Sequence, residues 1–106
     1  RCFCYVSDVI NVILAIMENE DGKNQIFNIG NPHETSINEL IEILGKIHGT
    51  KLIPEYQNFS KPGTKRRVPD ITKLKNLGYV PTVTLDEGLK KTYDWYADYY
   101  RNKNNS

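Results

Sequence analysis

The chain has 106 residues, which is enough for a single domain with a modest core. Hydrophobic residues make up 39% and charged residues 25%, and the formal net charge is +1, so no global field draws the protein to nucleic acid or to a membrane. No apolar run approaches the roughly 20 residues of a membrane span, and no signal peptide opens the chain. We therefore expect a cytoplasmic protein without nucleic-acid or membrane partners.

The chain starts with Arg1 and then with β-forming residues that predict a short strand over 3–6. Because it opens on arginine inside this strand, we expect a piece of a longer polypeptide. Cys2 and Cys4 would lie on one face of the strand, too constrained for a disulfide and without the further ligands of a zinc site. They are expected to be free thiols.

A helix then follows, and after it a strand, a helix and a strand that predict a βαβ unit. Ser7 or Asp8 can cap an apolar first helix, which we expect to be buried on more than one side and to end at a turn. Residues 25–29 read as a second strand. A capping box from Ser36 opens a helix with one apolar stripe, Gly49 stops it, and 51–54 form a third strand. This spacing predicts a small α/β fold with a parallel, right-handed unit.

The most informative stretch is the basic loop, residues 61–67, with the residues that follow it. Pro62 and Gly63 predict a turn, and the loop contains four cations: Lys61, Lys65, Arg66 and Arg67. Asp70 can cap a helix of about two turns that Gly78 stops. Guanidinium groups match phosphate oxygens in a bidentate way, so the loop could clamp a phosphate. A solvated basic loop stays open as the alternative.

A second capping box from Thr84 opens the last helix, which carries a tyrosine-rich face with Trp95 beside it. The spacing of these aromatic residues predicts burial. Residues 102–106 are polar, and we expect them to form a disordered tail.

The sequence contains no complete catalytic or cofactor machinery. There is no G-x-G-x-x-G or P-loop, and a Tyr-x-x-x-Lys pair starting at Tyr5 fails because its fourth following residue is Val9. His33 and His48 are separate and without partners for a metal. Ligand binding is better supported: in a parallel sheet, Asn28 and the glycine after it would face the edge where ligands gather. Together with Arg1 and the basic loop, they would suit a diphosphate.

Five segments in order resemble the extended short-chain dehydrogenase/reductases that act on nucleotide sugars. They are similar to the R-x-F-x-Y-V-x-D, N-I-G-N-P, R-R-x-P-D-x-[ST]-K, L-G-[WY]-x-P and L-x-E-G-L-x-K-T-x-x-W motifs of that family. Here they read RCFCYVSD from residue 1, NIGNP from 28, RRVPDITK from 66, LGYVP from 77 and LDEGLKKTYDW from 85.

The resemblance implies that residues 1–101 are the C-terminal nucleotide-sugar-binding region of an NAD-dependent epimerase, dehydratase or decarboxylase, a helix-rich region that packs on an absent N-terminal Rossmann domain. That domain holds NAD and the catalytic Tyr-x-x-x-Lys, so this region alone would be inactive and bind no cofactor. The complete enzyme is expected to be a homodimer that takes a UDP- or dTDP-linked sugar. The implied substrate-binding residues are Arg1, Tyr5, Asn28, Lys61, Arg66, Arg67 and Asp70.

Two departures from the family pattern, Lys61 and Thr64, leave the choice of reaction open. Which of Arg66 and Arg67 contacts phosphate also stays open. The alternative from another class is a free-standing small module that binds RNA backbone through the basic loop, or a protein partner through the tyrosine-rich helix.

Overall fold

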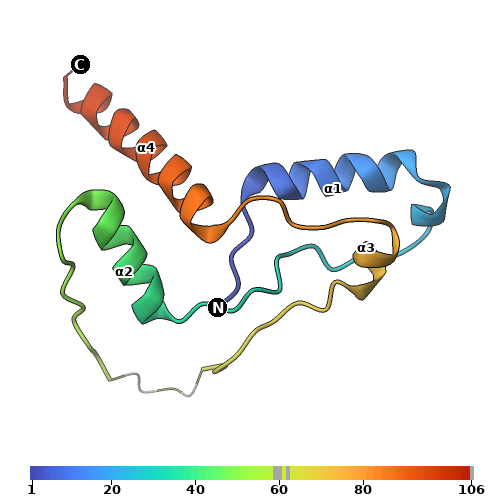
Figure 1. Cartoon of the computed structure of the whole chain (residues 1–106), viewed down its shortest axis with the longest axis horizontal. Coiled ribbons are helices and arrows are strands. Elements are labelled where there is room, and N and C mark those ends of the chain that lie inside the picture. Colours follow the sequence, from blue (N-terminus) through green and yellow to red (C-terminus); the bar gives the residue numbers. More distant parts are fainter. Residues whose placement is uncertain (59–60, 62, 106) are drawn as a thin grey trace.

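A computed structural model describes residues 1–58, 61 and 63–105. Its elements are four α-helices and one short 3₁₀ helix, connected by long extended segments (Figure 1): α1 (Val6–Glu18), η1 (Glu20–Gly22), α2 (Ile37–His48), α3 (Thr72–Asn76) and α4 (Leu85–Asn104). The radius of gyration is 17.4 Å, against about 13 Å for a compact domain of 100 residues. The principal extents of 47 × 41 × 22 Å describe a thin, spread-out layer.

The buried core of this layer is small. Val12, Ile71 and Leu74 are its buried hydrophobic residues, so α1 and α3 meet there. Many large apolar side chains are instead exposed, including Ile10 and Met17 of α1. The prediction that the first helix is buried on more than one side is therefore wrong, because nothing in the described chain covers its outer face.

The predicted βαβ unit is also wrong. None of the described residues forms a strand, and the only pairing is an isolated antiparallel bridge between Cys2 and Glu34. Segments 3–6, 25–29 and 51–54 have β-forming side chains, but a strand needs a neighbour to pair with. Ile26 and Ile53 are 84% and 87% exposed, which shows that these extended segments lie against no sheet. The fold is helix-rich, as expected, without the α/β sheet.

α1 begins two or three residues earlier than predicted, at Val6, with Tyr5 as its N-cap residue and no side-chain cap. Neither Ser7 nor Asp8 caps it. The carboxylate of Asp8 is fully buried and accepts hydrogen bonds from a segment 74 residues away in the sequence, at Thr82. Asp8 therefore serves tertiary structure rather than the helix end.

Both predicted capping boxes are confirmed. The Ser36 hydroxyl accepts from the Glu39 N–H, the Glu39 carboxylate accepts from the Ser36 N–H, and Thr84 and Glu87 repeat the pattern. α2 ends at Gly49, which is left-handed with φ of 87°, as predicted. These signals are local, and so they hold although the expected sheet is absent.

The sequence predicts Asp70 as the N-cap residue of α3, but Ile71 holds that position without a side-chain cap, and the helix has five residues rather than about two turns. The Asp70 carboxylate still accepts from the N–H of Thr72 at 3.0 Å, and the chain turns after the helix at Gly78, whose φ is 89°, as predicted. The Tyr79 N–H returns to the Leu74 carbonyl, which completes a Schellman motif. Pro62, part of the predicted turn, lies outside the described residues.

α4 differs from the prediction on two points. Its aromatic face is exposed rather than buried: Trp95 is 60% exposed and Tyr99 is 47% exposed, and their rings stack at 5.3 Å. The helix also continues to Asn104, so it includes residues 102–104 of the expected tail. Within the described chain, no helix is long and apolar enough to cross a membrane.

Candidate functional site

Three segments far apart in the sequence meet beside the N-terminus. Arg1 and Thr35 exchange backbone hydrogen bonds of 2.8 Å. The amide of Asn28 donates to the Asp70 carbonyl at 3.3 Å. A Cβ built on Gly30 would come within 2.9 Å of the Pro69 ring, so only glycine allows this close approach. The chain start, the 28–31 turn and residues 69–70 therefore lie together.

A pocket of about 590 Å³ opens where these segments meet. Its lining combines two guanidinium side chains with a glycine turn and two thiols: Cys2, Cys4, Ile29, Gly30, Asn31, Arg66, Arg67, Val68 and Pro69. Backbone groups at a glycine turn can approach a ligand closely, and paired arginines suit phosphate oxygens. The arrangement can bind an anion; the lining contains no acid–base pair.

The two arginines of the pocket have different partners. Arg66 forms a bidentate ion pair with Glu34, with both N···O distances 2.6 Å. Its hydrogen bonds lower the pKa of Glu34 below the ordinary value, and the same contact raises the pKa of Arg66. Among the described residues, Arg67 makes one hydrogen bond, of 3.3 Å, to the Thr64 hydroxyl of its own loop. Most of the donor capacity of Arg67 is thus free for a ligand.

The other predicted site residues do not line this pocket: Arg1, Tyr5, Asn28, Lys61 and Asp70. The guanidinium of Arg1 and the ammonium of Lys61 are exposed and do not line it. Tyr5 packs its ring on Gly88 of α4, where an added Cβ would lie 3.2 Å from the ring, and Lys91 sits 5.5 Å from the ring centroid. The carboxylate of Asp70 is occupied by Thr72.

The thiol of Cys4 is a neutral wall of the pocket. Burial raises the pKa of Cys4, and the nearby Tyr79 hydroxyl offsets this only in part. Burial, with Cys4 beside it, raises the pKa of Tyr79 to about 12. The Tyr79 hydroxyl makes no hydrogen bond of acceptable geometry with any described residue, although the thiol is close enough to influence it. Neither group titrates near neutral pH.

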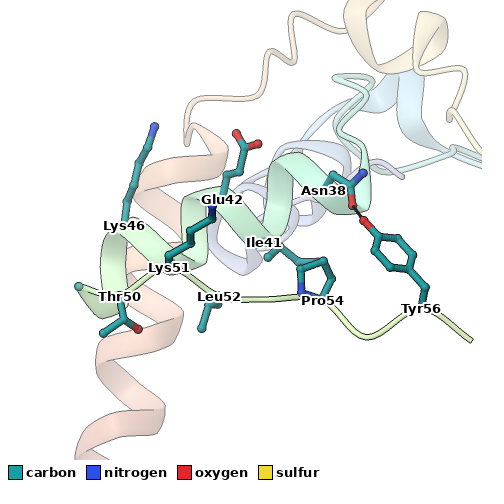
Figure 2. A pocket seen from close by; sticks show the side chains of 11 residues that line it. Asn38, Ile41, Glu42, Lys46, Thr50, Lys51, Leu52, Pro54 and Tyr56 are labelled. Atoms are coloured by element: carbon teal, nitrogen blue, oxygen red, sulfur yellow. Dashed lines mark hydrogen bonds between the residues drawn. The ribbon is translucent and has the colours of Figure 1, made fainter.

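A larger, open groove of about 870 Å³ lies between α2 and residues 49–56 (Figure 2). The Tyr56 hydroxyl donates to the Asn38 amide oxygen at 3.3 Å and bridges the two walls at one end. Glu42, Lys46 and Lys51 give its walls mixed charge. None of the predicted site residues lines this groove. In the described part of the chain, no cluster of histidine, cysteine and acidic residues could hold a metal ion.

Sequence reasoning missed two carboxylates with distant partners. Asp8 ties α1 to the segment before α4, and Glu34 occupies Arg66. Asp8 stands in the V-x-D part of the first motif, where its type was visible but was read as a helix cap. Glu34 follows the N-I-G-N-P turn, and no local pattern links it to an arginine 32 residues later.

No protein-family model matches the chain. Putative GDP-L-fucose synthase 2 of Arabidopsis thaliana is 32% identical over 98 residues, which cover 92% of this chain and 30% of that protein. UDP-glucuronic acid decarboxylase 1 of Xenopus tropicalis is 36% identical over 97 residues, covering 91% and 23%. The solved UDP-glucuronic acid 4-epimerase of Bacillus cereus, in complex with UDP-glucuronic acid and NAD, superposes with a TM-score of 0.85 at 31% identity, over 94% of this chain and 32% of that one.

The chain is homologous to one segment of the nucleotide-sugar epimerase, decarboxylase and GDP-fucose synthase family. The predicted resemblance to extended short-chain dehydrogenase/reductases is confirmed. The chain spans 30% and 23% of the lengths of the two curated relatives named above. This family segment has the exposed apolar surfaces of a part rather than of a self-sufficient domain.

Proposed function

We propose that the chain is the nucleotide-diphosphate-binding segment of an NAD-dependent nucleotide-sugar epimerase, dehydratase or decarboxylase. The observation that carries the proposal is the pocket at the basic loop, where Arg66 and Arg67 lie against the Gly30 turn. Structural homology to an epimerase crystallised with UDP-glucuronic acid and NAD supports the ligand class. UDP- or dTDP-linked sugars are the expected substrates.

Within this pocket, Arg67 is the phosphate ligand of choice. Among the described residues its guanidinium has one weak bond, to Thr64, whereas Arg66 already makes two hydrogen bonds to Glu34. The carboxylate of Glu34 occupies the fork of Arg66 and leaves Arg67 to the ligand.

The residues of this chain do not fit NAD. A dinucleotide site needs a strand followed by a glycine-rich turn and a helix, and the sequence has no G-x-G-x-x-G while its described residues form no strand. The cofactor therefore belongs to another part of the enzyme. The exposed apolar face of α1 supports a second body against which this segment packs, and its apolar residues include Val6, Ile10, Ile13, Leu14 and Met17.

One observation favours a second function, protein binding through α4. Trp95, Tyr96, Tyr99 and Tyr100 form a continuous exposed cluster with ring centroids 4.9–6.3 Å apart. Large exposed aromatic clusters mark interaction surfaces. The two functions are separable, because this cluster contributes no residue to the pocket at the basic loop.

Calorimetric titration of the complete native polypeptide that contains this chain, with UDP, dTDP and GDP in turn, tests the proposed function. Binding of at least one nucleotide, together with conversion of a matching nucleotide sugar when NAD is supplied, is the expected result. A polypeptide that binds none of the three would contradict the proposal. Trp95→Ala is the control, since it lies outside the pocket and should leave the affinity unchanged.

A further inference from the structure

Glu34 and Arg66 form the only side-chain hydrogen bonds that connect residues 63–67 to the rest of the described chain. Both guanidinium edges take part, with Nε to Oε1 and Nη2 to Oε2 each at 2.6 Å. Arg67 bonds only to Thr64, inside the same loop. Residues 63–67 have no regular secondary structure. In the described chain, Glu34 is therefore their one side-chain hydrogen-bonding anchor.

Glu34 itself sits on well-anchored backbone. It pairs with Cys2 in the antiparallel bridge, and its neighbour Thr35 is 5% exposed and exchanges backbone hydrogen bonds with Arg1. Two residues further on, Ser36 starts the capping box of α2. The Glu34 carboxylate therefore stands on backbone that several hydrogen bonds hold in place, whereas residues 63–67 have no regular secondary structure.

We propose that Glu34 is a positioning residue for nucleotide binding, which acts through Arg66 to hold the basic loop so that Arg67 faces the diphosphate. The inference rests on the proposed function. The side chains of Arg66 and Glu34 are 77% and 42% exposed, and exposed ion pairs add little to folding stability. A bidentate pair with fork geometry does, however, fix orientation.

Competition between Glu34 and phosphate for Arg66 predicts the opposite result. If Glu34 competed with phosphate for Arg66, its removal would free a second guanidinium and tighten binding. Positioning predicts weaker binding, because the loop loses its one side-chain tie to the frame. The direction of the change therefore separates the two roles.

A double-mutant cycle in the complete native polypeptide provides the test, with UDP, dTDP and GDP as probes in calorimetry. We expect Glu34→Gln to weaken nucleotide binding about 3- to 10-fold and to have no further effect in an Arg66→Gln background. The thermal midpoint should move little. Glu55→Gln, an exposed glutamate outside the pocket, is the matched control and should bind as the unchanged protein does.

The outcomes also separate this inference from the proposed function. Unchanged or tighter binding by Glu34→Gln, or equal weakening with and without Arg66, overturns the positioning role while the nucleotide site stands. A polypeptide that binds none of UDP, dTDP and GDP overturns the proposed function, and the positioning role falls with it. Weaker binding that disappears in the Arg66→Gln background supports both.

Discussion

The carboxylate of Asp8 accepts hydrogen bonds from both the backbone N–H and the hydroxyl of Thr82, the latter at 2.7 Å. The Val83 N–H adds a further bond of 3.1 Å. Asp8 is 1% exposed, so this cluster joins α1 to the segment leading into α4 where water cannot substitute. It is the main polar link between the first and last parts of the chain.

Replacing Asp8 with Asn should release this link. An amide keeps one acceptor oxygen but turns an N–H₂ group toward N–H donors, so at least one buried bond is lost. We expect the local opening free energy to fall by about 1.5–3 kcal/mol. The amide exchange rates of Thr82 and Val83 should then rise roughly 10- to 150-fold. Hydrogen exchange read by mass spectrometry measures this. Asp21→Asn, at an exposed carboxylate, should leave those rates unchanged.

The same carboxylate predicts the acid sensitivity of the region. Burial alone would raise the pKa of Asp8, but the hydrogen bonds from Thr82 and Val83 outweigh it and lower the pKa. A carboxylate with a depressed folded-state pKa contributes stability above its unfolded value of about 3.9, and loses it as the pH falls through the folded value. The difference in local opening free energy between the unchanged protein and Asp8→Asn should therefore become smaller below about pH 4. A difference that widens with acid would contradict this account.

The two capping boxes make separate predictions for α2 and α4. Ser36→Ala and Thr84→Ala each remove an acceptor for the third helical N–H, and each should cost about 1 kcal/mol. Ser7→Ala is a matched control, because the structure places Ser7 inside α1 and not at its cap. Denaturant unfolding midpoints of the three variants, measured by the helical circular dichroism signal, test this prediction. Equal losses in all three variants would show that the caps contribute nothing specific.

The seat of the basic loop can be tested at Gly30. A Cβ there would approach the rigid Pro69 ring to 2.9 Å, so Gly30→Ala should push residues 66–70 outward and weaken nucleotide binding up to about tenfold. Gly63→Ala is the control in the same loop, since nothing lies within 4 Å of its added methyl group. Calorimetry with UDP compares the two. Retained affinity in Gly30→Ala would mean that the turn does not set the pocket.

Local and non-local features of this chain differ in how far the sequence predicts them. The helix ends at Ser36, Thr84, Gly49 and Gly78 follow from contacts within a few residues, and the structure has them where expected. The strands depend on pairing partners that the described chain does not contain, so residues with strong β-propensity remain extended and unpaired.

The candidate site shows the same division. The family resemblance places Asn28 and the 66–70 segment at one site, and the structure has the Asn28 amide on the Asp70 carbonyl although the expected sheet edge is absent. The partners of individual charges could not be predicted, since Asp8 and Thr82 are 74 positions apart and Glu34 and Arg66 are 32 apart. A capping residue and a buried acceptor also look alike in sequence, which explains the wrong prediction for Asp8.

The nucleotide-diphosphate site is the central claim, and the affinity of Arg67→Ala for UDP tests it most directly. The comparison uses the complete native polypeptide, with Lys51→Ala as a control that removes a cation outside the pocket. Loss of a charge-assisted contact worth about 1.5–3 kcal/mol predicts that the Kd of Arg67→Ala for UDP rises roughly 10- to 150-fold. NAD occupancy and the affinity of Lys51→Ala for UDP should be unchanged. Arg67→Ala that binds UDP as tightly as the unchanged protein would contradict the account.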